Sequence, residues 1–209
     1  GHAVPAATRS VVNQPLAGRP AVSPVASDGD PIPVHRRTIA LVGLMGVGKS
    51  TVGRRLAKRL GLPFADGDIE IEAAAAMTVS DIFAKLGEAE FRAGEARVIK
   101  RLLHAPRMVL ATGGGAVLNP ETRAELQDRA VTVWMRADLE TVAARVQRRD
   151  TRPLLRGRDP LEALKAMAEV RNPFYAMADV TVDVASGAHA EAVENIVQAL
   201  EAYWTEAAA

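Results

Sequence analysis

The chain has 209 residues, 48% of them hydrophobic, and this length fits one folded domain. Its formal net charge is +1 at pH 7, and such a balance argues against a protein that binds nucleic acid or a membrane surface. The sequence contains no cysteine, which excludes disulfides and cysteine metal ligands and is typical of a cytoplasmic protein. No apolar run approaches the ~18 residues that cross a bilayer, so we expect no membrane partner.

The first part of the chain differs from the rest in composition. Residues 1–35 contain six prolines among Ala, Ser, Gly and Val, without hydrophobic periodicity. We therefore predict a disordered N-terminal arm over residues 1–35 and one folded domain over residues 36–204. The arm lacks the apolar core of a signal peptide, and its shortage of acidic residues leaves a transit peptide as the alternative interpretation.

A strand, a glycine-rich loop and a helix open the folded part. Residues 38–42 (TIALV) form the kind of apolar run that a buried parallel strand contains. Residues 43–51 then read GLMGVGKST, which fits the P-loop pattern for a nucleoside triphosphate. Apolar residues at helical spacing over 52–60 predict a helix that ends at Gly61. This order of elements supports nucleotide binding over a simple turn.

Each part of the P-loop has a chemical reason. Gly46 and Gly48 let backbone N–H groups surround a phosphate without a clashing side chain. Lys49 supplies positive charge for the β- and γ-phosphates, and the Ser50 hydroxyl is placed to bind Mg²⁺. We assign nucleotide binding to the loop and the start of its helix, namely Gly46, Val47, Gly48, Lys49, Ser50 and Thr51.

Two carboxylates follow the next predicted strand, at residues 63–65. Asp66 and Asp68 are two positions apart, so they would share a face of an extended segment. One could hold Mg²⁺ through water, and the other could orient or deprotonate an attacking hydroxyl. The later strand end at residues 108–111 carries no carboxylate, so Asp66 is the leading metal ligand. The alternative is that these residues only form a turn and cap a helix.

The strand at residues 108–111 runs into three consecutive glycines at 113–115. Such a run weakens a strand unless something must approach the backbone closely. A substrate held against these backbone N–H groups and a tight strand-to-helix turn are the two interpretations of this run.

Two helical arginines have an ambiguous pattern. Arg92 lies early in a helix predicted over residues 88–103, and Arg171 ends one predicted over residues 160–171. Either could grip a carboxylate with its planar guanidinium. Either could also be a surface residue, and Arg171 could simply favour the negative end of its helix dipole.

An arginine-rich segment precedes that last helix. Residues 145–158 contain six arginines, including Arg145 and Arg152. A solvated charge run is the common explanation of such a segment. With a P-loop upstream, we favour a mobile lid at about residues 149–160 that brings arginines onto a transferring phosphoryl group.

Strands and helices alternate along the whole folded part, which predicts an α/β fold with a parallel sheet covered on both faces. In such a sheet, ligands gather at the carboxyl ends of the strands. The other predicted helices span residues 69–77, 78–87, 138–148 and 190–204, with another starting at 119, and the other strands span 130–134 and 179–184.

Taken in order, these landmarks resemble shikimate kinase from about residue 37 to residue 200. The pieces that carry the resemblance are GLMGVGKST at 43–51, DGD at 66–68, GEAEFR at 87–92, ATGGG at 111–115, TRPLL at 151–155 and RNPFY at 171–175. The resemblance implies a three-layer α/β/α P-loop kinase with a five-stranded parallel sheet in the order 2-3-1-4-5. It also implies transfer of the γ-phosphoryl of ATP to the 3-hydroxyl of shikimate, in the route to chorismate and the aromatic amino acids.

The resemblance also implies roles for individual residues. Ser50, and Asp66 through water, would hold Mg²⁺, and Asp68 would contact the acceptor hydroxyl as the candidate base. Arg92 and Arg171 would clamp the shikimate carboxylate. The remaining implied contacts are backbone donors from Gly114 and Gly115, Arg152 on the phosphates, Arg145 beside the adenine or the phosphates, and Glu95 orienting Arg92. We expect a monomer, as is usual in the family. The adenine loop here, ASGAH at 185–189, lacks the family's frequent basic or amide residue.

Two other functions compete with this one. A gluconate-type kinase on the same fold would explain the P-loop and the lid, but would not need both carboxylate-gripping arginines. A nucleotide-dependent switch would explain the P-loop, but would leave Asp68 and the three glycines without a role. A panel of phosphoacceptors distinguishes the three.

Overall fold

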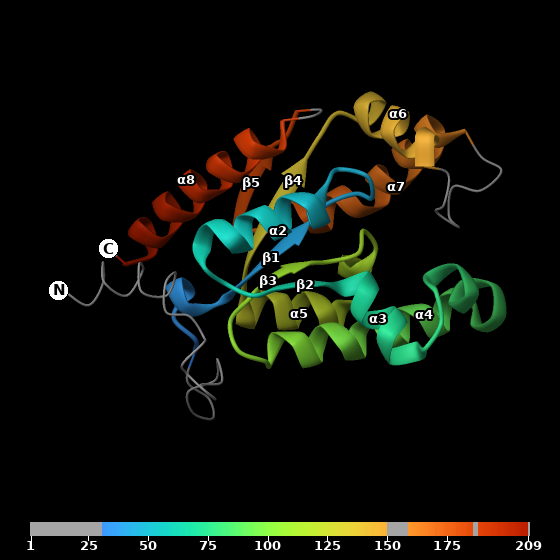
Figure 1. The fold of residues 1–209 in the computed structure, drawn as a ribbon, viewed down its shortest axis with the longest axis horizontal. Coiled ribbons are helices and arrows are strands. Elements are labelled where there is room, and N and C mark those ends of the chain that lie inside the picture. The colour runs from blue at the N-terminus through green and yellow to red at the C-terminus, as the bar shows by residue number, and fades with distance from the viewer. Residues whose placement is uncertain (1–30, 150–158, 186–187, 209) are drawn as a thin grey trace.

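The structure is a computed structural model, and it describes residues 31–149, 159–185 and 188–208. A five-stranded sheet forms its centre, between two layers of helices (Figure 1). The strands are β1 (Thr38–Val42), β2 (Phe64–Asp66), β3 (Val109–Ala111), β4 (Ala130–Arg136) and β5 (Val180–Asp183).

The strands pair in parallel in the order β2-β3-β1-β4-β5, which confirms the predicted fold class and strand order. Strand β1 occupies the centre, where Ile39 is in register with Val109 of β3 and Val131 of β4. Every residue of β1 is buried, as expected for an apolar run covered on both faces. The carboxyl ends of the strands therefore lie along one edge of the sheet, where ligands of α/β proteins collect.

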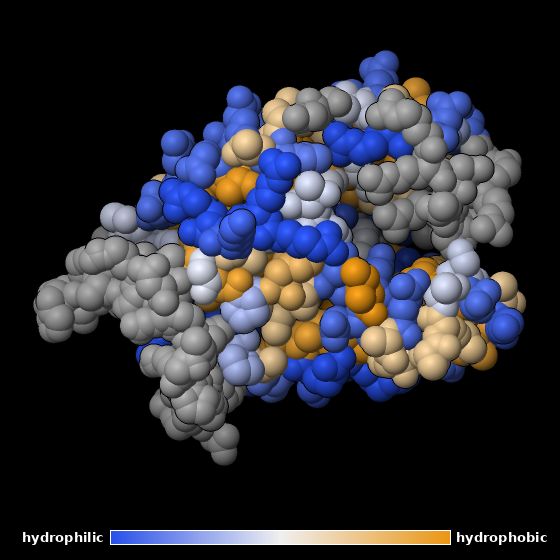
Figure 2. Space-filling view, in the orientation of Figure 1, coloured by the Kyte–Doolittle hydropathy of each residue, from blue (hydrophilic) through white to orange (hydrophobic). Residues whose placement is uncertain are grey.

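Helices cover the sheet and pack against one another in pairs. They are α2 (Lys49–Leu60), α3 (Gly67–Ala75), α4 (Val79–Leu103), α5 (Pro120–Arg129), α6 (Leu139–Arg149), α7 (Pro160–Tyr175) and α8 (His189–Ala208), with short 3₁₀ turns η2 (Val34–Arg36) and η3 (Ala116–Leu118). Helix α2 packs against α8, α3 and α5 pack against α4, and α6 packs against α7. Hydrophilic side chains cover the outer face of α2 in Figure 2, where Arg54, Arg55, Lys58 and Arg59 are exposed.

Helix α4 contains an interruption at Gly87. The sequence predicted two helices that meet here, and the structure joins them into one element with a kink, because Gly87 has φ 86° and ψ 166°. Glycine adopts this backbone conformation at little cost, whereas an L side chain rarely does. The hydroxyl of Thr78 accepts a 3.0 Å hydrogen bond from the amide of Asp81, so the first part of α4 is capped as predicted.

Helix α7 extends further than the sequence predicted. The sequence predicted an end at Arg171, but the helix continues to Tyr175 with Pro173 inside it. The proline removes one backbone donor, and the complete burial of Tyr175 offsets that loss. Arg171 therefore lies one turn before the end of the helix and is 5% exposed. The interpretation of Arg171 as a surface cation at a helix end is wrong.

The described part of the chain begins before the predicted domain boundary. Ile32 is buried, and its carbonyl accepts a 2.7 Å hydrogen bond from Nε of Arg37. Residues 31–35 thus pack on the domain. The prediction of a disordered arm lies outside the described residues for positions 1–30, and most of the predicted lid, residues 150–158, lies outside them as well.

Candidate active site

The P-loop connects β1 to α2 at the carboxyl edge of the sheet. Gly46 and Gly48 have φ values of 82° and 98°, which are open to glycine and strained for other residues. A Cβ atom at Gly46 would come within 2.7 Å of Cγ2 of Val146 on α6, so the loop also needs glycine for space. Gly48 is the N-cap of α2, and the positive end of the helix dipole therefore faces the loop.

Lys49 is the first residue of α2 and folds back over the P-loop. Its side chain is buried, and Nζ donates hydrogen bonds to the carbonyl oxygens of Gly43 at 2.5 Å and Leu44 at 2.9 Å. These contacts fix the ammonium group beside the backbone that would cradle a phosphate. An ammonium group at this place can bridge the loop and the phosphates of a nucleotide.

Ser50 and Asp66 lie together where β2 ends beside the start of α2. The Ser50 hydroxyl donates a hydrogen bond to Oδ2 of Asp66. The other oxygen of Asp66 accepts from the amides of Asp68 at 2.9 Å and Ile69 at 3.2 Å, and so caps α3. The sequence posed capping and metal binding as alternatives, but one carboxylate oxygen caps the helix while the other meets the serine.

This pair fits a magnesium ion that shares its ligands with a nucleotide. A hydroxyl and a carboxylate are the hard oxygen donors that Mg²⁺ prefers, and Mg²⁺ usually combines one or two such groups with waters and substrate phosphates. Within the described ranges, no group of three or more His, Asp or Glu side chains could hold a metal ion alone. Ser50 and Asp66 would therefore leave the other ligand positions of a bound Mg²⁺ to waters and substrate phosphates.

A cleft lies beside the P-loop. Its lining combines apolar side chains, four charged groups and three glycines: Met45, Asp68, Val79, Phe83, Phe91, Arg92, Glu95, Gly113, Gly114, Gly115 and Arg171. The segment 113–115, called the glycine loop below, also touches the P-loop. A Cβ atom at Gly114 would lie 3.2 Å from the backbone nitrogen of Met45. The cleft therefore adjoins the P-loop.

The glycine loop lets charged side chains come up to the backbone. A Cβ atom at Gly113 would be 3.0 Å from carboxylate oxygens of both Asp68 and Glu95. One at Gly114 would be 3.1 Å from Nη1 of Arg171, and one at Gly115 would be 2.3 Å from Nη2 of Arg92. The close approach that the three glycines predicted is therefore present, although the groups that approach are the protein's own charged side chains.

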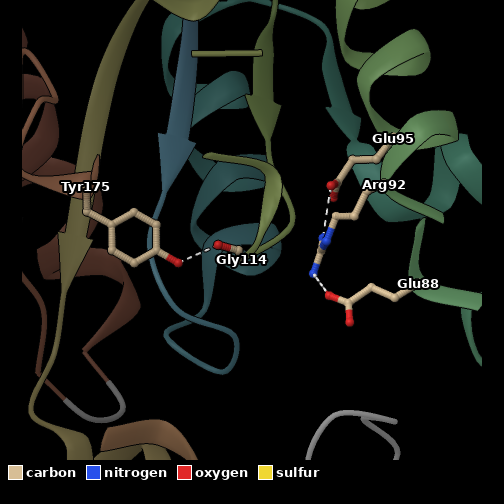
Figure 3. Close-up of polar contacts among 5 residues, drawn as sticks. All are labelled: Glu88, Arg92, Glu95, Gly114 and Tyr175. Atoms are coloured by element: carbon tan, nitrogen blue, oxygen red, sulfur yellow. Dashed lines mark hydrogen bonds and ion pairs between the residues drawn. The ribbon is translucent and has the colours of Figure 1, made fainter. Parts of the chain in front are cut away.

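Arg92 projects from α4 into this cleft and is held by two carboxylates of the same helix (Figure 3). Its Nη1 donates to Oε1 of Glu95 at 2.9 Å, and its Nη2 lies 3.6 Å from Oε2 of Glu88. Among the described residues, buried Nε of Arg92 and buried Oε2 of Glu95 have no hydrogen-bond partner. Buried polar atoms are normally satisfied, so these two atoms favour a polar ligand in the cleft.

Glu95 is 2% exposed. Its burial raises the pKa of the carboxyl group above the ordinary value of 4.5, although the charge and the hydrogen bond of Arg92 act in the opposite direction. The hydrogen bond from Arg92 to Glu95 is the direct contact by which the resemblance implied that Glu95 orients Arg92.

Arg171 approaches the glycine loop from α7, at Gly114, whereas Arg92 approaches it from α4, at Gly115. Its burial has a clear cause, because the guanidinium lies against Gly114 rather than at the surface. A buried guanidinium without a close carboxylate partner of its own is a typical receptor for an anionic ligand. Within the described ranges, Arg171 forms no ion pair with a carboxylate.

Two side chains from the C-terminal half of the chain lie against the P-loop, which is called the nucleotide end below. Nη1 of Arg145 on α6 donates to the carbonyl of Gly46 at 2.7 Å. His189 begins α8, and its Nε2 would lie 3.4 Å from a Cβ atom at Gly48. Burial lowers the pKa of His189, and the charges of Arg145 and Arg55 lower it further. The sequence predicted Arg145, whereas it placed His189 in the adenine loop at 185–189 without assigning a role to the imidazole. Arg152 lies outside the described residues.

Comparison with known proteins identifies a family. The sequence model of the family described as shikimate kinase matches residues 45–201. A shikimate kinase of Caulobacter vibrioides is 58% identical over 176 residues, which are 84% of this chain and 88% of that protein. One from Bradyrhizobium diazoefficiens is 50% identical over 167 residues, or 80% of this chain and 81% of that protein.

Solved structures give the same result. A shikimate kinase from Acinetobacter baumannii in complex with shikimate matches with a TM-score of 0.78 and 38% identity, over 80% of this chain and 94% of that one. A gluconokinase from Sinorhizobium meliloti matches with a TM-score of 0.55 and 21% identity, over 85% of this chain and 97% of that one. The second likeness concerns the fold alone.

Proposed function

The chain belongs to the shikimate kinase family, and on that premise we propose that the P-loop binds ATP and the adjoining cleft binds shikimate, with the residues assigned below. The reaction is ATP-dependent phosphorylation of the shikimate 3-hydroxyl, which gives shikimate 3-phosphate and ADP in the biosynthesis of aromatic amino acids. The observation that carries the assignment is the convergence of Asp68, Arg92 and Arg171 on the glycine loop, next to the P-loop.

The nucleotide end binds the phosphates of ATP. Backbone N–H groups of residues 46–51 surround the phosphates, and Lys49 contacts the β- and γ-phosphates. Arg145 lies against the P-loop and is placed to contact the nucleotide. Ser50 and Asp66 would hold Mg²⁺, which supplies charge neutralisation of the phosphates when it is bound.

The cleft beside the P-loop, called the acid end below, binds shikimate by the carboxylate of the substrate. Arg92 and Arg171 clamp the carboxylate from two helices, and the amides of Gly114 and Gly115 add backbone donors. A planar guanidinium matches a carboxylate with two parallel hydrogen bonds, so two such groups fix the position and the orientation of a small acid. The neighbouring apolar side chains of Phe83 and Phe91 shape the cleft around the ring.

Asp68 is the base of the transfer step. Its carboxylate lies beside Gly113 of the glycine loop and lines the cleft that adjoins the P-loop. The acceptor hydroxyl attacks the γ-phosphorus, its proton passes to Asp68, and the bond to the β–γ bridging oxygen breaks to release ADP. Charge on the transferring group is stabilised by Lys49, and by Arg152 in this proposal.

The proposal extends to the state of the protein in the cell. In the part of the chain that the structure describes, no helix has the length and apolar character to cross a membrane. We propose a cytoplasmic monomer that acts on small molecules and has no nucleic-acid partner, in keeping with a formal net charge of +1.

An assay of ADP release tests the proposal directly. Purified protein is supplied with ATP and Mg²⁺, with and without shikimate, and in parallel with gluconate. We expect rapid ADP release only with shikimate. Release with gluconate instead would assign the acid end to a sugar acid, and ATP binding without release on any acid would support a nucleotide switch. Omission of Mg²⁺ should abolish the shikimate-dependent rate.

A further inference from the structure

Tyr175 is a buried polar residue beside the acid end that the proposed reaction does not use. It is fully buried at the end of α7, and its hydroxyl donates a 2.5 Å hydrogen bond to the carbonyl oxygen of Gly114 (Figure 3). The hydroxyl thus links α7 directly to the glycine loop. Hydrophobic burial alone would be served equally well by phenylalanine, so the hydroxyl needs an explanation of its own.

The phenol acts as a donor at every pH at which the enzyme works. Burial raises the pKa of Tyr175 to about 12, although the charge of Arg171 acts in the opposite direction. The hydroxyl therefore keeps its proton, and its bond to Gly114 does not depend on pH near neutrality.

This hydrogen bond fixes a peptide plane of the glycine loop. The carbonyl of Gly114 and the amide N–H of Gly115 belong to the same planar trans peptide, so they point in opposite directions. When Tyr175 holds the carbonyl on the α7 side, the amide is directed away from α7. Within the described ranges, neither the amide of Gly114 nor that of Gly115 donates to a backbone carbonyl. Glycine has many accessible backbone conformations, so such a loop needs an external constraint.

The same tyrosine stands one helical turn after Arg171. Residues at this spacing share a face of the helix, and Nη1 of Arg171 would lie 3.1 Å from a Cβ atom at the same Gly114. The ring of Tyr175 packs against that of Trp134 on β4, with centroids 5.8 Å apart. The sheet thus holds the ring, and the hydroxyl sets the distance between α7 and the loop.

We propose that Tyr175 is a positioning residue for the acid substrate: its hydroxyl fixes the glycine loop and Arg171 in the mutual arrangement that receives the carboxylate. This role rests on the proposed binding of shikimate at the acid end. Tyr175 is not among the residues that line the acid cleft, so we assign it an action through Gly114 and Arg171.

Tyr175→Phe tests the proposal, because it removes the hydroxyl and keeps the ring. We expect the KM for shikimate to rise about tenfold, the size expected when a buried carbonyl loses its donor, while the KM for ATP stays within about twofold. An unchanged KM for shikimate, or an equal rise in both KM values, would overturn the proposal. A residue that only stabilised the fold would lower Tm without changing the ratio of the two KM values.

Tyr203→Phe is the matched control. Tyr203 lies on α8, and its hydroxyl donates to Oδ1 of Asp179 at 3.2 Å. Neither residue lines the acid cleft, so we expect neither KM to change. The wild-type assay is read first. If shikimate releases no ADP from the wild type, the proposed function fails. If shikimate does so but Tyr175→Phe behaves like the control, only the role of Tyr175 fails.

A second measurement needs no variant at position 175. The chain contains two tyrosines, so labelling with ¹³C at Cζ gives two resonances, and Tyr203→Phe assigns them. We expect saturating shikimate to shift the Tyr175 resonance and to leave that of Tyr203 in place. A Tyr175 resonance that does not move at saturation would overturn the proposal even if Tyr175→Phe failed to fold.

Discussion

The two ends of the active site are built in different ways. The nucleotide end comes mainly from one continuous stretch, residues 43–51, whose glycines and lysine are fixed by contacts within the loop. The acid end is assembled from α3, α4, α7 and the glycine loop, which the sheet brings together. The difference teaches that a phosphate needs only a local backbone shape, whereas a small acid with several hydroxyls needs charged groups placed from many directions.

The largest effect is expected at Lys49, the proposed contact of the β- and γ-phosphates. Lys49→Ala should lower kcat by about 10³-fold, because it removes charge stabilisation in the transition state. Shikimate binding by calorimetry should be retained if the two ends are independent. Lys58→Ala, on the exposed face of α2, is the matched control and should keep full activity. Near-normal kcat in Lys49→Ala would refute the role of the loop.

The next effect concerns the base. Asp68→Asn keeps the size of the side chain and removes the charge that accepts a proton, so kcat should fall about 10²-fold or more. The Kd for ATP should hardly change, since Asp68 belongs to the acid end. Single-turnover kinetics measure the transfer step itself. Asp128→Asn, exposed on α5, serves as the control, and an unchanged rate in Asp68→Asn would reduce that residue to a structural role.

A substitution at Gly115 tests whether the acid end can be altered without an effect on the nucleotide end. In Gly115→Ala the new methyl group would lie 2.3 Å from Nη2 of Arg92, so the guanidinium must move away from its position beside the glycine loop. We expect the KM for shikimate to rise about tenfold with no change in the KM for ATP, because only the acid loses its orienting contact. Gly94→Ala in α4 is the control, since its methyl group would meet only Nη2 of Arg97, at 3.7 Å. If both KM values rise together, the two ends are not separable at this point.

The smallest effect is on stability. Because the folded-state pKa of Glu95 is raised above 4.5 by burial, the folded protein holds the proton to a higher pH than the unfolded chain. Unfolding then releases a proton between these two pKa values, and the free energy of unfolding falls as pH rises through that window. Glu95→Gln should show a shallower decline when urea unfolding is measured from pH 4 to pH 8. Parallel curves for the two proteins would contradict a raised pKa.

Sequence reasoning was successful where the signal is local. The alternation of strands and helices predicted the sheet, and the P-loop pattern predicted the nucleotide end. It left Arg92 and Arg171 ambiguous, because a helical arginine on the surface and one in a cleft look the same in sequence. Arg171 is buried because its guanidinium lies against Gly114. Helix α7 also continues past Pro173, so tertiary packing overrides the tendency of proline to end a helix.

Two residues near the site were not singled out from the sequence. Tyr175 shares a helical face with Arg171, but this spacing is informative only once α7 is known to reach it. His189 approaches Gly48 because α8 packs against α2, a contact between distant parts of the chain. In both cases the missing information was the packing of one helix against a loop from another part of the sheet.

The kink at Gly87 has a consequence for how the enzyme opens. It divides α4 into a short first part, with Val79 and Phe83 at the acid cleft, and a longer second part that carries Arg92 and Glu95. Helical hydrogen bonding is interrupted between them, so the first part can unfold locally without the second. Amide hydrogen exchange should therefore reveal two cooperative units in one helix, the faster one at the rim, where an acid must enter and its phosphorylated product must leave.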